Sequence, residues 1–169
     1  IMSSDWSSDV CSSDLWEVLR KGRDVAILAV GTMVLEALEA ADELAQEGMD
    51  ATVVNCRFLK PYDQEVFREI LRDHSLVLTV EEGAVVNGFG AFLAREVDGM
   101  PQAEGVHMEA LGIPDQFVSH GDRGALLREI DLDAPGIASR IRRMARDAAG
   151  HREGLSEGST DAGPARETA

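Results

Sequence analysis

The sequence lacks the long apolar runs and the clustered positive charge that would connect it to a membrane or to nucleic acid. No stretch approaches the eighteen or so uninterrupted apolar residues of a membrane span, and the N-terminus lacks the basic-then-apolar order of a signal peptide. The chain has 16 Lys and Arg against 31 Asp and Glu, giving a net charge of −15 at pH 7. Neutralising phosphates requires clustered basic side chains. We therefore expect a cytoplasmic protein that binds neither nucleic acid nor a membrane.

Cysteine is scarce, and the common catalytic and metal-binding motifs are missing. Cys11 and Cys56 lie far apart in the sequence, which indicates neither a disulfide framework nor a Cys-x-x-Cys site. Cys56 stands among apolar strand residues, so we expect it to be a small buried side chain. The four histidines show no metal-ligand spacing, and the chain has no P-loop, no G-x-G-x-x-G and no G-x-S-x-G. Residue chemistry alone therefore predicts no catalytic residue and no metal ligand.

Composition divides the 169 residues into three parts. Residues 1–15 are rich in Ser and Asp and contain the triplet Ser-Ser-Asp three times, and residues 149–169 are small, polar and without periodicity. Neither end can bury enough apolar surface to offset the entropy cost of ordering it, so we expect both to be disordered. Residues 16–148 show regular apolar periodicity and are predicted to form one domain.

The apolar pattern of the middle part alternates between strands and helices. Residues 16–19 and 25–30 are predicted to form a hairpin, and further strands are expected at 51–59, 75–80 and 106–112. Helices are expected between these strands, with Thr32 and Asp63 as N-caps, and at 121–132 and 134–148 after the last strand. Strands joined by helices imply right-handed parallel crossovers. The predicted fold is a three-layer α/β/α sandwich around a mixed five-stranded sheet, mostly parallel, with one antiparallel edge strand.

The candidate sites lie where the parallel strands end, because ligands on such sheets bind near the carboxyl ends of the strands. Glu81 and Glu82 could form a general acid/base pair, but neighbours on a strand point to opposite faces. We favour a structural role, in which one carboxylate caps backbone N–H groups or pairs with a cation. Gly88 and Gly90 could belong to a cofactor loop, but they also allow a helix to start close to the sheet or to a partner, which we favour.

Three segments in succession resemble one family, the C-terminal domain of 1-deoxy-D-xylulose-5-phosphate synthase within the transketolase superfamily. The most specific pieces are N-x-R-F-x-K-P-x-D at 55–63, V-E-E at 80–82 and G-[IL]-P-D-x-F-x-x-H-G at 112–121. Asn87 stands where the family commonly has glycine, although asparagine also tolerates positive φ. The motif positions, for which we expect structural or interdomain roles, are Arg57, Lys60, Pro61, Asp63, Glu81, Glu82, Gly88, Gly90, Gly112, Pro114, Asp115 and Gly121.

The resemblance implies a role in a larger enzyme. In that family an N-terminal domain holds the diphosphate of thiamine diphosphate and Mg²⁺, and a glutamate of the central domain activates the cofactor. Both domains are absent from this chain, and the third domain packs against them and helps to form a homodimer. The resemblance therefore implies no catalytic, cofactor-binding or metal-binding residue here, and an inactive fragment. The alternatives are the same domain of a transketolase or of a 2-oxoacid dehydrogenase β subunit, or a free-standing interaction module.

The opening Ser/Asp segment does not fit that family. Its aspartates lack the alternate-residue spacing of a calcium loop, and the spacing of its triplets fits neither a helical face nor a strand face. The string DWSSDVCSSDL resembles translated sequencing adapter instead. We therefore interpret residues 1–15 as a non-native segment, with native sequence beginning at about Trp16.

Overall fold

A five-stranded sheet with the order β1-β3-β2-β4-β5 runs through the centre of the structure, a computed structural model that describes residues 15–117 and 120–157. Strands β3, β2, β4 and β5 are parallel, and β1 lies antiparallel to β3 at one edge. This confirms the predicted mixed sheet. The strands are β1 (Glu17–Arg20), β2 (Val25–Ala29), β3 (Ala51–Asn55), β4 (Leu76–Ala84) and β5 (His107–Ile113).

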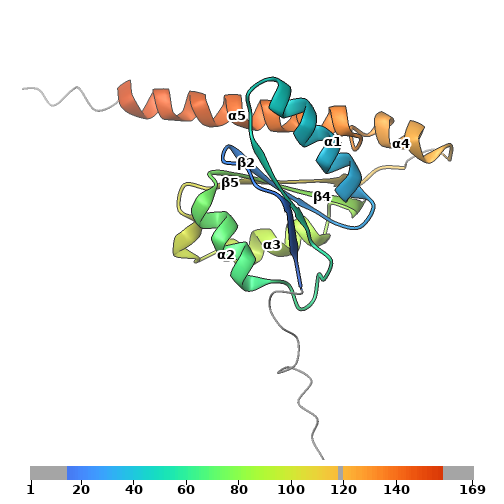
Figure 1. The fold of residues 1–169 in the computed structure, drawn as a ribbon, viewed down its shortest axis with the longest axis horizontal. Helices are drawn as coiled ribbons and strands as arrows, with labels where there is room; N and C mark the ends of the chain where they lie inside the picture. The colour runs from blue at the N-terminus through green and yellow to red at the C-terminus, as the bar shows by residue number, and fades with distance from the viewer. Residues whose placement is uncertain (1–14, 118–119, 158–169) are drawn as a thin grey trace, which may run out of the picture.

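Helices cover both faces of this sheet (Figure 1). On one face lie α1 (Met33–Gln46), α4 (Arg123–Glu129) and α5 (Ala134–Glu157). On the other lie α2 (Gln64–Asp73), α3 (Phe89–Val97) and the short 3₁₀ helix η2 (Pro101–Ala103). The architecture is therefore the predicted three-layer α/β/α sandwich.

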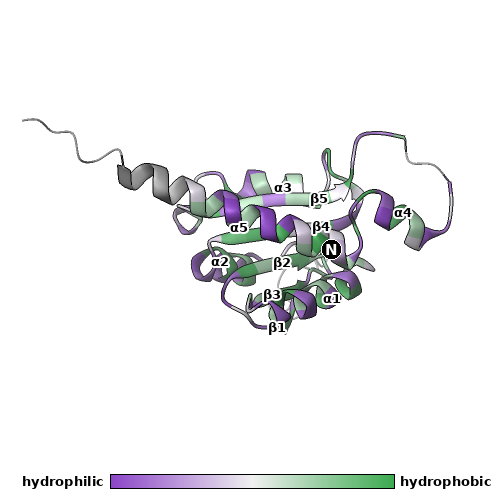
Figure 2. Cartoon of the chain, turned by 90° about the horizontal axis from the view of Figure 1, so that it is seen from above, coloured by the Kyte–Doolittle hydropathy of each residue, from purple (hydrophilic) through white to green (hydrophobic). Residues whose placement is uncertain are grey.

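Each face of the sheet has its own hydrophobic core, and alternate residues of β2 supply both. Val25, Ile27 and Ala29 pack with α1 and α5, whereas Ala26 and Leu28 pack with α2 and α3. All five are fully buried, as expected for a central parallel strand covered on both sides. In Figure 2, β2 is coloured as hydrophobic, whereas the coloured part of α5 alternates between hydrophilic and hydrophobic residues.

The predicted hairpin of the first two strands is wrong, because β1 pairs with β3 and not with β2. Gly22 crosses the beginning of β3 so closely that a Cβ there would lie 2.5 Å from the carbonyl carbon of Ala51. Its backbone N–H donates to the Thr52 hydroxyl at 2.9 Å. β2 already pairs with β3 on one side and with β4 on the other. The strand β1 therefore pairs with the remaining free edge of β3.

Several element boundaries differ from the sequence prediction. The strand expected at 51–59 ends at Asn55, and the one expected to end at Val80 continues to Ala84 across a register shift. The helix expected at 121–132 covers only Arg123–Glu129. The last helix, expected to end at residue 148, continues to Glu157 and so enters the segment that we expected to be disordered. The rest of that segment, residues 158–169, lies outside the described residues.

The first two described residues are buried, so the expectation that residue 15 is disordered is wrong, and the domain boundary near Trp16 stays a prediction. Leu15 is 8% exposed and Trp16 is 2% exposed, and both belong to the core on the α2 and α3 face. The proposed non-native segment, apart from Leu15, lies outside the described residues, so its interpretation stays a prediction.

Candidate functional site

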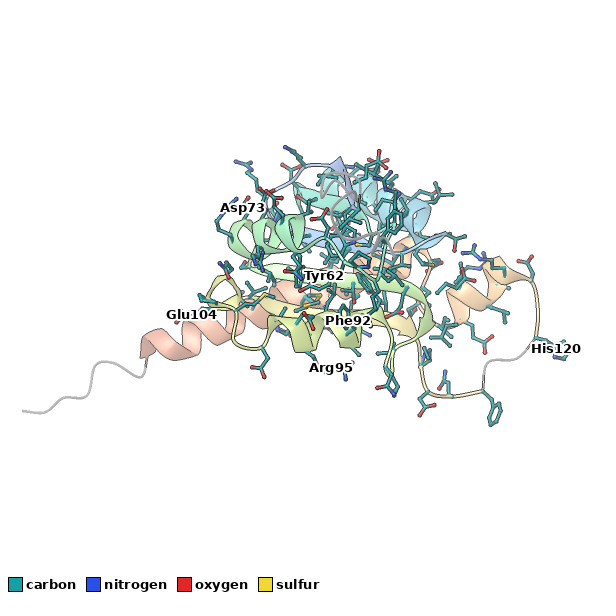
Figure 3. All side chains as sticks on the ribbon, turned by 90° about the horizontal axis from the view of Figure 1, so that it is seen from below. Tyr62, Asp73, Phe92, Arg95, Glu104 and His120 are labelled. Carbon is teal, nitrogen blue, oxygen red and sulfur yellow. The ribbon has the colours of Figure 1, made fainter. Side chains whose placement is uncertain are left out.

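Most of the predicted site residues lie at one edge of the sheet, where the parallel strands end. Figure 3 shows the two ends of the molecule: Asp73, at the end of α2, and Glu104 lie at one, and His120, shortly before α4, lies at the other. We call the second end the carboxyl edge. It contains the residues that directly follow β2, β3, β4 and β5.

Glu81 is a buried helix cap. Its side-chain oxygens accept hydrogen bonds from the backbone N–H groups of Phe89, at 3.0 Å, and Gly90, at 2.9 Å, which are the first two residues of α3. Glu81 is only 8% exposed. A carboxylate at a helix N-terminus satisfies orphan N–H groups and favours the helix dipole. The prediction that one of the paired glutamates caps backbone N–H groups is therefore confirmed.

Gly88 and Gly90 allow this close approach of α3 to the sheet, and Gly112 of β5 lies equally close to β4. A Cβ on Gly88 would lie 2.5 Å from Oε1 of Glu81, and one on Gly112 would lie 2.7 Å from the carbonyl oxygen of Gly83. A Cβ on Gly90 would meet the Thr79 hydroxyl and lie 2.5 Å from the Cβ of Ala110. The contacts of these glycines are with this chain's own strands, which agrees with the structural reading of the glycine loop.

Asn87, just before this helix, has φ of 60°. This is the left-handed conformation that asparagine tolerates better than most residues. Asparagine at position 87 is therefore compatible with the turn before α3.

Glu82 points the other way and binds the start of α4. Its carboxylate accepts hydrogen bonds from Arg123, the shortest at 2.7 Å, and from the Thr32 hydroxyl at 2.7 Å. The prediction that Thr32 caps α1 is therefore wrong for its side chain, because the Thr32 hydroxyl donates to Glu82 instead. The register shift of β4 falls between Val80 and Ala84, where the two carboxylates diverge. Glu81 and Glu82 consequently do not form a facing acid/base pair.

The Glu82 pair predicts a small stability loss that depends on pH. Hydrogen bonds from Arg123, followed by the one from Thr32, lower the pKa of Glu82 below its ordinary value of 4.5. A lowered carboxylate pKa stabilises the fold above the ordinary value and loses this effect as the pH falls through the folded value. Glu82→Gln should lower the free energy of unfolding by under about 1 kcal/mol at neutral pH, since the pair is partly exposed. Well below pH 4.5 the difference should vanish.

Urea unfolding of the variant and the unchanged chain at both pH values measures this effect. Glu129→Gln, on the exposed side of α4, is the matched control and should behave like the unchanged chain at both pH values. A Glu82→Gln difference that persists at low pH would show that the carboxylate's charge is not its cause.

The segment between β3 and α2 holds four predicted positions, of which only Asp63 is buried. Asp63 is 1% exposed and caps α2 by accepting from the N–H of Val66 at 3.1 Å, as predicted. Arg57 is exposed, with a guanidinium nitrogen 4.0 Å from the Glu17 carboxylate. Lys60 and Pro61 are also exposed, and the peptide bond between them is cis. In this segment Asp63 therefore caps the start of α2, whereas Lys60 stays on the surface.

The last motif segment, after β5, is the most open part of the carboxyl edge. Asp115 and Gly121 are exposed, and Pro114 is half-buried. Gly121 helps to line a cavity of about 400 Å³ beneath α4, together with Glu82, Ile113, Arg123, Leu126, Leu127 and Ile130. The structure thus divides the motif residues into a buried group around α3, a capping group at α2 and an exposed group near α4.

Two residues that fasten these groups were not predicted as site residues. Trp16 is 2% exposed, its ring packs against Tyr62, Phe67 and Phe89, and its Nε1 donates to the Phe58 carbonyl at 2.9 Å. Arg123 pairs with Glu82 across 41 positions of sequence. The only signal for Trp16 was a large aromatic side chain beside an apolar strand, and spacing gives no signal for Arg123.

The geometry does not fit a site for a diphosphate and a metal ion. Among the described residues, no group of three or more His, Cys, Asp or Glu could hold a metal ion. The buried Glu81 carboxylate is committed to two N–H groups, and Arg123 to Glu82.

Cys56 is buried, as predicted, and burial raises the pKa of its thiol well above the ordinary value. In the part of the chain that the structure describes, no helix is long and apolar enough to cross a membrane.

The chain matches a known protein family over most of its length. Residues 14–137 match the family described as "Transketolase, C-terminal domain". The chain belongs to this family. The matched residues include the sheet, helices α1 to α4 and the beginning of α5. They therefore contain nearly all of the two hydrophobic cores.

Several curated relatives of this transketolase C-terminal domain bear the name 1-deoxy-D-xylulose-5-phosphate synthase. The synthase of Geobacillus thermodenitrificans is 43% identical over 127 residues, covering 75% of this chain and 20% of that relative. Synthase 1 of Geobacter sulfurreducens is 44% identical over 125 residues, covering 73% and 19%. The chain thus spans about a fifth of the length of the curated relatives it matches. The resemblance stated from the sequence motifs is confirmed.

Solved structures agree on the fold. A split-gene transketolase, described as an inactive β4 tetramer, has a TM-score of 0.69 and 34% identity, covering 76% of this chain and 41% of that chain. A transketolase from Pichia stipitis has a TM-score of 0.59 at 20% identity, covering 84% of this chain and 19% of that chain. The second likeness bears on the fold alone.

Proposed function

We propose that this chain is the C-terminal domain of a 1-deoxy-D-xylulose-5-phosphate synthase, and that it acts by packing and not by chemistry. The observation that carries the proposal is the match of its ordered core, at 40–44% identity, to about a fifth of each synthase relative. The full enzyme would condense pyruvate with glyceraldehyde 3-phosphate and release carbon dioxide. It would act in the cytoplasm, as a homodimer, in isoprenoid and thiamine precursor synthesis.

The chemistry would come from parts of the enzyme outside this chain. Thiamine diphosphate, held with Mg²⁺ by the other domains, would supply the nucleophile for pyruvate and the electron sink for decarboxylation. The residues of this chain would hold the carboxyl edge in shape: Glu81 fixes the start of α3, Asp63 that of α2, and Arg123 that of α4. A rigid carboxyl edge would hold the domains packed against it in a fixed position. A domain without reacting groups can support an active site in another domain in this way.

A split-gene transketolase also bears on the activity of this chain, which matches 41% of that relative's length. That relative is described as inactive, and we expect this chain alone to be inactive too. Incubated with thiamine diphosphate, Mg²⁺, pyruvate and glyceraldehyde 3-phosphate, the 169-residue chain should release no carbon dioxide.

A graft tests the positive part of the proposal. In the grafted synthase, the 127 matched residues of the Geobacillus thermodenitrificans enzyme are replaced by those of this chain. We expect it to form 1-deoxy-D-xylulose 5-phosphate, and the same synthase without the matched residues to form none. Turnover by the isolated chain, or a folded graft that forms no product, would contradict the proposed function.

A further inference from the structure

Exposed large apolar side chains occur in the segments that follow the parallel strands. Of the seven large hydrophobic residues that are exposed in the described part of the chain, five follow the ends of the four parallel strands. These five form what we call the carboxyl-edge patch: Leu35 after β2, Phe58 and Leu59 after β3, Val86 after β4 and Phe117 after β5. Isolated surface hydrophobics are normal, but a set repeated at every strand end of one edge indicates an interaction surface.

The two remaining exposed hydrophobics lie on the edge strand of the sheet. Val18 and Leu19 lie on β1, which pairs with the last three residues of β3. The opposite edge differs, because none of these seven residues lies where the parallel strands begin. Among the described residues, the exposed large hydrophobics are therefore absent from the edge where the parallel strands begin.

The chain also enters the domain at the carboxyl edge. Because β1 is antiparallel, its first residue Glu17 lies opposite Asn55, the last residue of β3. Trp16, just before it, is held by its ring contacts and by Asp63, whose Oδ2 accepts from the Trp16 N–H at 3.3 Å. The first described residues of the chain therefore lie at the edge that carries the patch.

The edge is also hollowed next to the patch. The cavity of about 400 Å³ beneath α4 has Ile113, Leu126 and Ile130 in its wall, and the Glu82–Arg123 pair closes one side. Its walls are largely apolar side chains, which suit an apolar group from another surface. The exposed charges of Lys60 and Asp115 lie at the strand ends of β3 and β5 and frame the patch.

We propose that the carboxyl-edge patch is the surface on which the preceding domain of the synthase polypeptide docks. This proposal rests on the proposed function. The occupant is the domain joined to Trp16, because about four fifths of each curated relative lies outside the match and the chain arrives at this edge. Its docking face carries an apolar side chain for the cavity beneath α4, an acidic group opposite Lys60 and a basic group opposite Asp115.

Cysteine labelling at the two ends of the molecule tests this docking surface. Val86→Cys reports on the patch, and Glu104→Cys, at the opposite end in Figure 3, is the matched control. Both are made with Cys11→Ser, in the 169-residue chain and in the grafted synthase, while Cys56 stays as a buried thiol. The readout is the ratio of the maleimide labelling rates at positions 86 and 104.

The ratio should fall by at least about tenfold on going from the isolated chain to the grafted synthase, because a docked interface excludes water and reagent. An unchanged or increased ratio would overturn the proposal. Labelling of Val86→Cys that slows in the isolated chain as its concentration rises would also overturn it, since a second copy would then occupy the edge.

The ratio of labelling rates is measured whether or not the grafted synthase is active. A graft that shields Val86→Cys without forming product counts against the proposed function alone, and an active graft with an unchanged ratio counts against this docking surface alone.

Discussion

Replacing Trp16 by alanine is expected to lower the free energy of unfolding by about 3–5 kcal/mol, the usual loss for a large buried aromatic side chain. The ring is 2% exposed and packs at centroid distances of 6.3 Å from Tyr62, 6.0 Å from Phe67 and 5.9 Å from Phe89. It thereby joins the start of β1 to α2 and α3. Domains of this size have a total stability of about 5–15 kcal/mol, so the variant should be close to unfolding.

Trp16→Phe is the control that separates packing from hydrogen bonding. Phenylalanine keeps most of the ring contacts but loses the 2.9 Å bond from Nε1 to the Phe58 carbonyl. We expect it to cost about 1 kcal/mol, the net value of one hydrogen bond. Urea unfolding followed by circular dichroism measures both variants. A loss below about 1 kcal/mol for Trp16→Ala would mean that this residue does not anchor the domain.

Glu81→Ala is expected to destabilise the fold by about 2–4 kcal/mol, whereas Glu82→Ala should cost under about 1 kcal/mol. Alanine at 81 leaves the buried N–H groups of Phe89 and Gly90 without their acceptor. Alanine at 82 removes a partly exposed pair with Arg123. The two neighbours share a residue type and a strand, so the comparison isolates the direction in which each side chain points.

Hydrogen exchange at the first turn of α3 gives a local measure of the same difference. The amides of Phe89 and Gly90 should exchange faster in Glu81→Ala and at the unchanged rate in Glu82→Ala. Equal effects of the two substitutions on stability and on exchange would rule out a special capping role for Glu81.

The layered fold follows from sequence pattern because each central strand is apolar on consecutive residues. In β2, Val25 to Ala29 are buried on both faces, which only a strand covered by helices on both sides allows. Capping by Asp63 could be predicted for a similar reason, since the signal and the N–H group that it serves lie three residues apart.

The long-range pairings could not be predicted in this way. The hairpin prediction failed because adjacent strands with a turn between them usually pair, whereas here Gly22 packs on the backbone of Ala51 and diverts the chain. The commitment of Thr32 to Glu82 was missed because its partner is 50 positions away and local propensity favours the cap. The opposite directions of Glu81 and Glu82 did follow from strand alternation, but the partner of each did not.

Steady-state release of carbon dioxide by the grafted synthase measures most directly whether this domain supports the reaction through packing. The graft should form folded dimers that release carbon dioxide from pyruvate and glyceraldehyde 3-phosphate within about tenfold of the parent rate, a barrier difference of ~1.4 kcal/mol. The synthase without its 127 matched residues should show no rate above background. A rate in that shortened enzyme equal to the parent's, or a folded grafted dimer without activity, would contradict the function proposed for this chain.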